Sequence, residues 1–163
     1  MRYHDIKTGD MLNGSGIRVT LFVSGCTHYC KGCHNPITWE PTGGLLFDDE
    51  AKRELFEELE KDYHKGVTFS GGDPLYPDNR AEITELAKEI KEKFPEKDIW
   101  LYTGFIYEGI CNLEIMNYID VLVDGEYMEE FKDNNYHWAG STNQLVIDVK
   151  ESLKNDRIKR YLR

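Results

Sequence analysis

Short apolar runs rich in β-branched and large side chains recur along the chain and predict β-strands. Each run is brief, and most end at a glycine or another turn residue, as strands buried on both faces do. We expect strands at residues 17–23, 66–70, 98–102, 120–123 and 144–149.

Between these runs, apolar residues recur at spacings of three and four, which predicts helices. A first helix is capped at 47–49 and runs to about Lys61; its buried face consists of Ala51, Leu55 and Leu59. A second presents Ile83, Leu86, Ala87, Ile90 and Phe94. A short helix is expected at 112–117, whereas 126–143 has little periodicity and is expected to be loop.

Strands that alternate with helices are typical of an α/β fold with a mostly parallel sheet and crossover helices. A complete eight-stranded barrel needs about 250 residues, more than the 163 of this chain. The sequence therefore predicts a partial, open β/α barrel or a curved open sheet. It contains no internal repeat and no long linker, so we expect residues 1–163 to form a single domain.

The chain is acidic, with a formal net charge of −10 from 20 basic and 30 acidic side chains. Nucleic acid and anionic membrane surfaces repel such a chain, so neither is an expected partner. No apolar run approaches the roughly 18 residues that span a bilayer, and residues 1–12 are polar without a signal core. These features favour the cytoplasm, where cysteines stay reduced or bind metal.

The candidate chemistry follows the predicted strands. A cysteine-rich loop follows the first strand, Ser70-Gly71-Gly72-Asp73 the second, Thr103-Gly104 the third and Asp124-Gly125 the fourth. Because parallel α/β folds place their sites at the carboxyl ends of the strands, we expect all of these segments to line one rim. Asp124 itself is more typical of a capping or solvated aspartate.

The cysteine-rich loop carries Cys26, Cys30 and Cys33 within eight residues. Thiolates are soft ligands that suit zinc or iron–sulfur clusters. Zinc in a structural site takes four ligands, and His28 or His34 could supply the fourth. Three cysteines on a four-iron cluster instead leave one iron open for a substrate. Cys111 stands apart and is expected to be a small buried thiol.

The pattern Cys-x3-Cys-x2-Cys after a first strand, together with Ser70-Gly71-Gly72-Asp73-Pro74 after the second, resembles the radical S-adenosylmethionine superfamily. The second motif alone is an ordinary turn. The resemblance extends to one branch, the activating enzymes of anaerobic ribonucleoside-triphosphate reductase. Its blocks, spread over nearly the whole chain, are 13–18, 21–26, 33–36, 38–39, 69–75, 102–104, 123–125 and 140–144.

This resemblance implies an open-barrel fold and a 4Fe–4S cluster whose ligands and catalytic residues are Cys26, Cys30 and Cys33. It implies S-adenosylmethionine on the open iron, held by residues of two segments. These residues are Gly32, Cys33, His34, Ser70, Gly71, Gly72 and Asp73. The superfamily often has an aromatic residue where this chain has Gly32, so adenine would be held by backbone around 32–34 or by a side chain such as Tyr29.

The implied reaction is reductive cleavage of S-adenosylmethionine, followed by hydrogen abstraction from a glycine near the C-terminus of the large reductase subunit. The implied partners are that subunit and a low-potential electron donor such as flavodoxin. Two alternatives stay open: an activase of another glycyl-radical enzyme, and a non-catalytic iron–sulfur or zinc protein.

Other side chains favour structural roles. The tryptophans, at 39, 100 and 138, are typical of core or interface positions, and the histidines at 4, 64 and 137 show no ligand spacing. The basic residues near the C-terminus indicate the charged end of a helix or a docking site for a partner; they are Lys154, Arg157, Lys159, Arg160 and Arg163.

Overall fold

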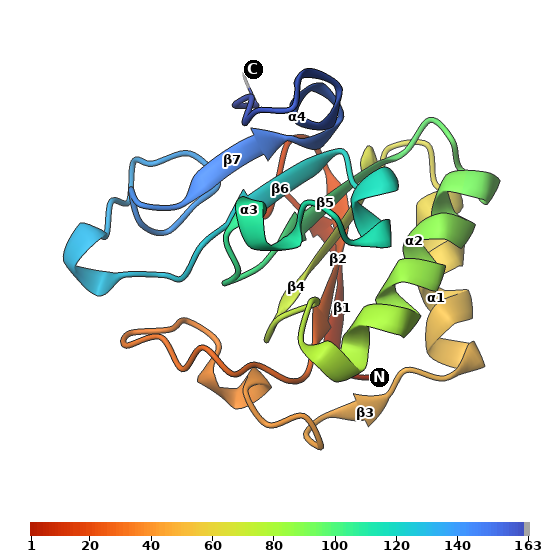
Figure 1. Cartoon of the computed structure of the whole chain (residues 1–163). Coiled ribbons are helices and arrows are strands. Elements are labelled where there is room, and N and C mark those ends of the chain that lie inside the picture. Colours follow the sequence, from red (N-terminus) through yellow and green to blue (C-terminus); the bar gives the residue numbers. More distant parts are fainter. Residues whose placement is uncertain (162–163) are drawn as a thin grey trace.

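A computed structural model of the chain describes residues 1–161 and contains one seven-stranded sheet (Figure 1). Its strands, in chain order, are β1 (Arg2–Asp10), β2 (Arg18–Val23), β3 (Leu45–Leu46), β4 (Gly66–Gly71), β5 (Asp98–Tyr102), β6 (Val121–Asp124) and β7 (Leu145–Asp148). In space the order is β3-β1-β2-β4-β5-β6-β7. The sheet is open and its edges are β3 and β7, so it does not close into a barrel.

The helices are α1 (Asp49–Glu60), α2 (Arg80–Lys93), α3 (Tyr107–Ile110) and α4 (Val149–Asn155). Short 3-10 turns are η1 (Pro36–Thr38), η2 (Pro77–Asn79), η3 (Glu114–Asn117) and η4 (Glu129–Phe131). Within residues 1–161, none of these helices is long and apolar enough to cross a membrane.

The α/β prediction is confirmed, but the expectation of a mostly parallel sheet is wrong. The pairs β2–β4, β4–β5 and β5–β6 are parallel, while the pairs β1–β2, β1–β3 and β6–β7 are antiparallel. The five predicted strands exist within one or two residues of their expected bounds. Because β7 follows β6 through an irregular loop instead of a crossover helix, it returns in the opposite direction.

Strand β1 was not predicted from the sequence. It is nine residues long but buries only Ile6 and Asp10, so it lacks the apolar run that identified the other strands. Its register with β2 also shifts twice, which breaks any simple alternation. Its polar composition is that of a strand outside the central parallel core.

The two long helices form as the periodicity predicts. The side chain of Asp48 caps α1 by accepting a hydrogen bond from the backbone N–H of Ala51 at 2.9 Å. The helix expected at 112–117 is shorter, the 3-10 turn η3, and α3 precedes it. Helix α4 ends at Asn155, followed by Asp156 in a left-handed conformation.

The C-terminal basic residues therefore do not all lie at a helix end, contrary to expectation. Lys154 lies in the last turn of α4. Arg157, Lys159 and Arg160 lie beyond it, and Arg160 pairs with Ile147 of β7. Arg163 lies outside the described residues.

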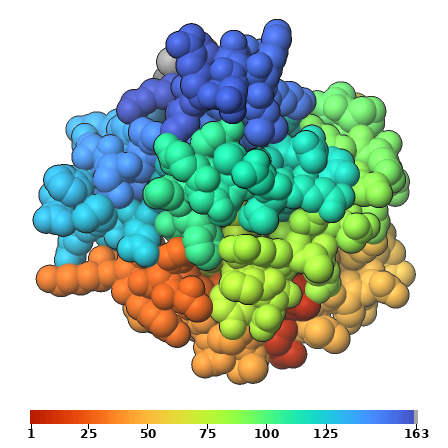
Figure 2. Space-filling model, viewed as in Figure 1, coloured from red at the N-terminus to blue at the C-terminus, as the bar shows by residue number. Residues whose placement is uncertain are grey.

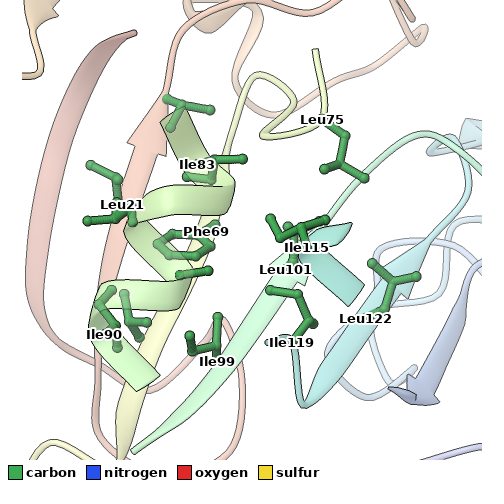
Figure 3. Close-up of a cluster of buried hydrophobic side chains, with 14 of the residues drawn as sticks. Leu21, Phe69, Leu75, Ile83, Ile90, Ile99, Leu101, Ile115, Ile119 and Leu122 are labelled. Carbon is green, nitrogen blue, oxygen red and sulfur yellow. The ribbon is translucent and has the colours of Figure 1, made fainter. Parts of the chain in front are cut away.

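One face of the sheet forms the main apolar core with the helices (Figure 3). Alternate residues of the central strands point to it, including Leu21, Phe69, Leu101 and Leu122, and Ile83 and Ile90 of α2 pack against them. On the other face, β2 and β4 bury the polar side chains of Arg18, Thr20 and Thr68, while β5 and β6 contribute a small second apolar cluster. The strand period of two thus separates the helix-covered apolar face from a face that is polar at β2 and β4.

Arg18 is the central polar contact on that second face. Its guanidinium forms an ion pair with Asp98 at 2.5 Å and donates to Thr68 Oγ1 and the Val67 carbonyl, both at 2.8 Å. It also lies 5.4 Å from the ring centroid of Trp100. One fully buried side chain thereby joins β2, β4 and β5.

We predict that Arg18→Ala lowers the free energy of unfolding by about 3–5 kcal/mol. The substitution removes the short ion pair of the partly buried Asp98 carboxylate, which keeps only the more distant ammonium of Lys65 at 3.8 Å. Chemical denaturation of the cluster-free protein measures this. The matched control is Arg53→Ala on the exposed side of α1, which should change stability by less than about 0.5 kcal/mol. Equal effects of the two variants would contradict the prediction.

Candidate functional site

The four strand-end segments surround one cavity of about 510 Å³. It is lined by Cys26 after β2, by Ser70, Gly71 and Gly72 at the end of β4, by Thr103 and Gly104 after β5, and by Gly125 after β6. The expectation that these motifs share one rim is therefore confirmed. Asp124 is not at the cavity surface; it is buried and accepts from the backbone N–H groups of Tyr107 and Leu145, a capping role.

The cysteine loop lies opposite the irregular segment 125–143 (Figures 1 and 2). Residues of both segments line the cavity. Backbone hydrogen bonds fix the start of the loop, from Gly25 N to Thr38 O at 2.8 Å and from Cys26 N to Trp39 O at 3.1 Å. Two left-handed residues, Tyr29 and Gly32, reverse the chain within it. Such reversals bring widely separated side chains of a short loop to one place.

All three cysteines of the loop are free thiols that line this cavity. Cys26 is buried and Cys30 and Cys33 are half-buried. Burial raises the pKa of the Cys26 and Cys30 thiols, because a low-polarity environment disfavours the thiolate. Ligation by a cationic iron centre would reverse this, since bound metal stabilises thiolate.

The donor set fits a 4Fe–4S cluster, because three soft sulfur donors face one open cavity. Within residues 1–161, no three His, Cys, Asp or Glu side chains are arranged around a single metal ion. Cys111 is half-buried, not fully buried as expected, and its Sγ lies 3.7 Å from the Glu108 carbonyl oxygen. It is not among the residues that line the cavity.

His28 is engaged in a way that removes it from the candidate zinc ligands. Its Nε2 lies 2.8 Å from Asp73 Oδ2, and its Nδ1 lies 2.9 Å from Glu126 Oε1. The hydrogen bond with Asp73 raises the pKa of His28, and burial opposes it. Both ring nitrogens are therefore occupied by carboxylates, and neither is left for a metal ion.

The glycine motif is pressed against the cysteine loop by backbone contacts. Gly72 N donates to Val23 O at 2.8 Å, and Asp73 N donates to Gly25 O at 2.7 Å. A Cβ at residue 72 would lie 2.6 Å from the Gly25 carbonyl oxygen and 2.7 Å from that of Thr38. Only glycine allows this approach, which leaves the backbone of the motif exposed to the cavity.

Asp73 lies behind the cavity surface and is 1% exposed. Besides His28, its carboxylate accepts hydrogen bonds from Leu75 N at 2.8 Å, Thr103 Oγ1 at 2.9 Å and Gly104 N at 3.0 Å. These donors come from the β4 turn and from the end of β5. The structure thus places Ser70, Gly71 and Gly72 at the cavity and gives the Asp73 carboxylate internal partners.

Aromatic residues that the sequence did not single out for this role form the far wall. Tyr127, Tyr136 and Trp138 line the cavity, and the ring of Tyr127 lies 5.4 Å from that of His34. They belong to 126–143, where no strand or helix periodicity indicates which side chains face inward. The aromatic content of that segment was the one available signal.

Gly32 and Tyr29, considered for adenine, do not line the cavity that the three cysteines share. A Cβ at residue 32 would lie 2.9 Å from Glu129 Oε1 and 3.4 Å from the Tyr127 ring. Tyr29 is 61% exposed and packs edge-on against Trp39, which does line the cavity. The space beside Gly32 is thus filled from the 125–131 segment.

The tryptophans divide between two roles. Trp100 is fully buried in a small second core with Val121 and Val123, as expected for a core residue. Trp39 and Trp138 are half-buried at the cavity.

Comparison with known proteins agrees with this geometry. Residues 12–147 match the family model described as a 4Fe-4S single cluster domain. The chain is 48% identical over 146 residues to the anaerobic ribonucleoside-triphosphate reductase-activating protein of Enterobacteria phage T4, covering 90% of this chain and 93% of that protein. It is 41% and 39% identical to the proteins of the same name from Haemophilus influenzae and Escherichia coli, in each case over 92% of this chain and 99% or more of the relative.

We predict that Cys26→Ala, Cys30→Ala and Cys33→Ala each reduce bound iron and sulfide to background after anaerobic reconstitution, because each removes one of the three thiolates at the cavity. Cys111→Ala is the matched control and should retain wild-type iron content. Iron and sulfide analysis with visible absorption measures this. Full iron loading in a cavity variant, or its loss in the control, would contradict the assignment.

Proposed function

The chain belongs to the family of anaerobic ribonucleoside-triphosphate reductase-activating proteins, and on that premise we propose that it is a radical S-adenosylmethionine enzyme that activates such a reductase. The observation that carries the proposal is the meeting of three free cysteines and an exposed glycine backbone in one cavity. Three thiols can hold an iron–sulfur cluster, and a glycine backbone beside them lets a small molecule that chelates the cluster come close.

In this proposal Cys26, Cys30 and Cys33 hold the 4Fe–4S cluster. The backbone of Ser70, Gly71 and Gly72 takes the amino end of S-adenosylmethionine, because these three residues line the cavity and the two glycines have no side chain to keep the ligand away. Asp73 supports that turn from behind through its four hydrogen bonds.

The adenosine end would lie along the aromatic wall of the same cavity. His34 and Tyr127 stand close together there, and flat π-surfaces stack with a nucleobase. Cys33 and His34 line the same end and would contribute backbone to it.

The chemistry that the bound cofactors supply is one-electron cleavage of the sulfonium to methionine and a 5′-deoxyadenosyl radical, which takes a hydrogen atom from a glycine of the reductase. The chain's own task is to fix geometry and limit water. The half-buried aromatic residues Trp39 and Trp138 cover part of the cavity wall.

The proposed partners are the large reductase subunit, through its C-terminal glycine segment, and a low-potential donor such as flavodoxin. The cavity is open to solvent, which suits a protein segment as substrate. Free thiols and an oxygen-sensitive cluster favour a reducing compartment, the cytoplasm.

Two other functions are weaker. An activase of a different glycyl-radical enzyme would use the same site, but the named relatives all activate the ribonucleotide reductase. A non-catalytic iron–sulfur or zinc protein would not need an exposed glycine turn beside the thiols.

We predict that the anaerobically reconstituted, reduced protein gives a 4Fe–4S electron paramagnetic resonance signal that changes shape when S-adenosylmethionine is added. Incubation with the reductase and a reductant should then yield a glycyl radical and methionine in comparable amounts. Cys111→Ala is the control and should behave as wild type.

Each negative result identifies an alternative. A cluster signal that is indifferent to S-adenosylmethionine would favour an electron carrier, and bound zinc without iron would favour a structural module. Cleavage without a radical on the reductase, but with one on another glycyl-radical enzyme, would change the assigned partner.

A further inference from the structure

His28 lies in the sequence between two of the proposed cluster ligands, yet carboxylates occupy both of its ring nitrogens, so neither is left for a metal ion. Its ring joins three separate segments of the site. Nε2 donates to Asp73 in the glycine motif, and Nδ1 contacts Glu126 in the segment after β6. The imidazole is only 10% exposed and Asp73 only 1%, so the contact between them is largely shielded from water.

The fold makes room for this ring at the end of β5. The edge of the ring packs on Phe105, with centroids 4.7 Å apart. A Cβ at Gly104 would lie 2.6 Å from the Cγ and Nε2 of His28, so residue 104 must be glycine for the imidazole to lie there. Gly104 N also donates to Asp73 at 3.0 Å, so the same residue touches both members of the pair.

We propose that His28 is a positioning residue that locks the cysteine loop to the glycine motif, and so sets the distance between the cluster and the S-adenosylmethionine site. The proposal rests on the proposed function. Cys26 and Cys30 flank His28 in sequence, and Gly72 precedes Asp73. The His28–Asp73 hydrogen bond therefore joins the two halves of the site directly, from one side chain to the other.

The contact with Asp73 carries more of this effect than the contact with Glu126. Asp73 is 1% exposed and Glu126 is 55% exposed at the side chain. A hydrogen bond with a buried carboxylate is worth more than an ion pair screened by water. Loss of His28 should thus be felt at the glycine motif more than in the 125–131 segment.

The first test measures equilibrium binding of labelled S-adenosylmethionine to the anaerobically loaded protein. His28→Ala should retain its iron but bind about 10- to 100-fold more weakly, as expected for losing a hydrogen bond to a charged group. His28→Gln keeps a donor at the position of Nε2 and should recover binding to within about 3-fold of wild type. The control is Lys31→Ala in the same loop, whose side chain is 93% exposed; it should bind as wild type.

Electron paramagnetic resonance gives a second readout that does not depend on turnover. The reduced His28→Ala protein should show a cluster signal without added ligand, but its change of shape should need correspondingly more S-adenosylmethionine. Binding by His28→Ala within about 3-fold of wild type would overturn the proposal. So would equally weak binding by His28→Gln and His28→Ala, because the ring would then act only by filling space.

A double-variant cycle covers the case in which His28→Ala loads poorly with iron. Gly104→Ala should displace the ring while leaving Asp73 and His28 in the chain, and should weaken binding by a similar factor. In the His28→Ala background, assayed per bound cluster, the same change should have little further effect, since the ring it displaces is gone. Additive losses would overturn the proposal. Failure of the wild-type protein to bind S-adenosylmethionine would instead refute the proposed function.

Discussion

The site depends on backbone pairing between the ends of β2 and β4. The parallel ladder of these strands continues beyond their last residues, through Gly72 N to Val23 O and Asp73 N to Gly25 O. No side chain separates the two segments there, because residue 72 has none. Main-chain pairing therefore brings the start of the cysteine loop and the glycine backbone to one cavity, before any cofactor is considered.

The rest of the sheet supports that junction differently on its two faces. The helix-covered face is apolar, with Leu21 and Phe69 fully buried, and provides the hydrophobic driving force of folding. The opposite face buries the Arg18 guanidinium. This burial is tolerated because the charge of Arg18 is paired with Asp98 and its N–H groups have acceptors. Directional polar contacts of this kind fix the relative position of the strands more sharply than apolar packing alone.

The sequence predicts the elements whose local pattern is strong. The buried strands and both long helices follow from apolar periodicity, and the strand-end motifs follow from the rule that places sites at carboxyl ends. Strand β1 is not predicted, because only Ile6 and Asp10 in it are buried and its pairing with β2 depends on the tertiary fold. The direction of β7 is not predicted for the same reason, because the local sequence of 144–149 does not indicate the direction of the neighbouring strand.

Local sequence patterns likewise do not predict which side chains of distant segments contact each other. His28 looked like a possible ligand because it lies between cysteines, but its partners are 45 and 98 positions away in the sequence. The motif predicts a cofactor contact for Asp73, whereas in the structure its carboxylate is buried and accepts hydrogen bonds from Leu75, Thr103 and Gly104. Such partners depend on the tertiary fold, which the motif itself does not specify.

The irregular wall of the cavity shows how a segment without periodicity can still be well defined. Gln144 Oε1 accepts from the backbone N–H groups of Gly140 and Ser141, each at 3.1 Å, and its Nε2 donates to Gly125 O at 3.0 Å. Tyr136 Oη donates to the Gln144 carbonyl at 2.7 Å. One amide side chain thus closes both ends of the segment onto each other.

This arrangement gives the block 140–144 a physical role that its composition does not suggest. In sequence it is a turn-like run of small and polar residues, and its glutamine would pass for a surface residue. In the structure Gln144 is buried, and each polar atom of its side chain has a partner in the segment it closes. The aromatic residues of the wall can then lie half-buried beside the cysteines, because hydrogen bonds hold their backbone where a helix or strand otherwise would.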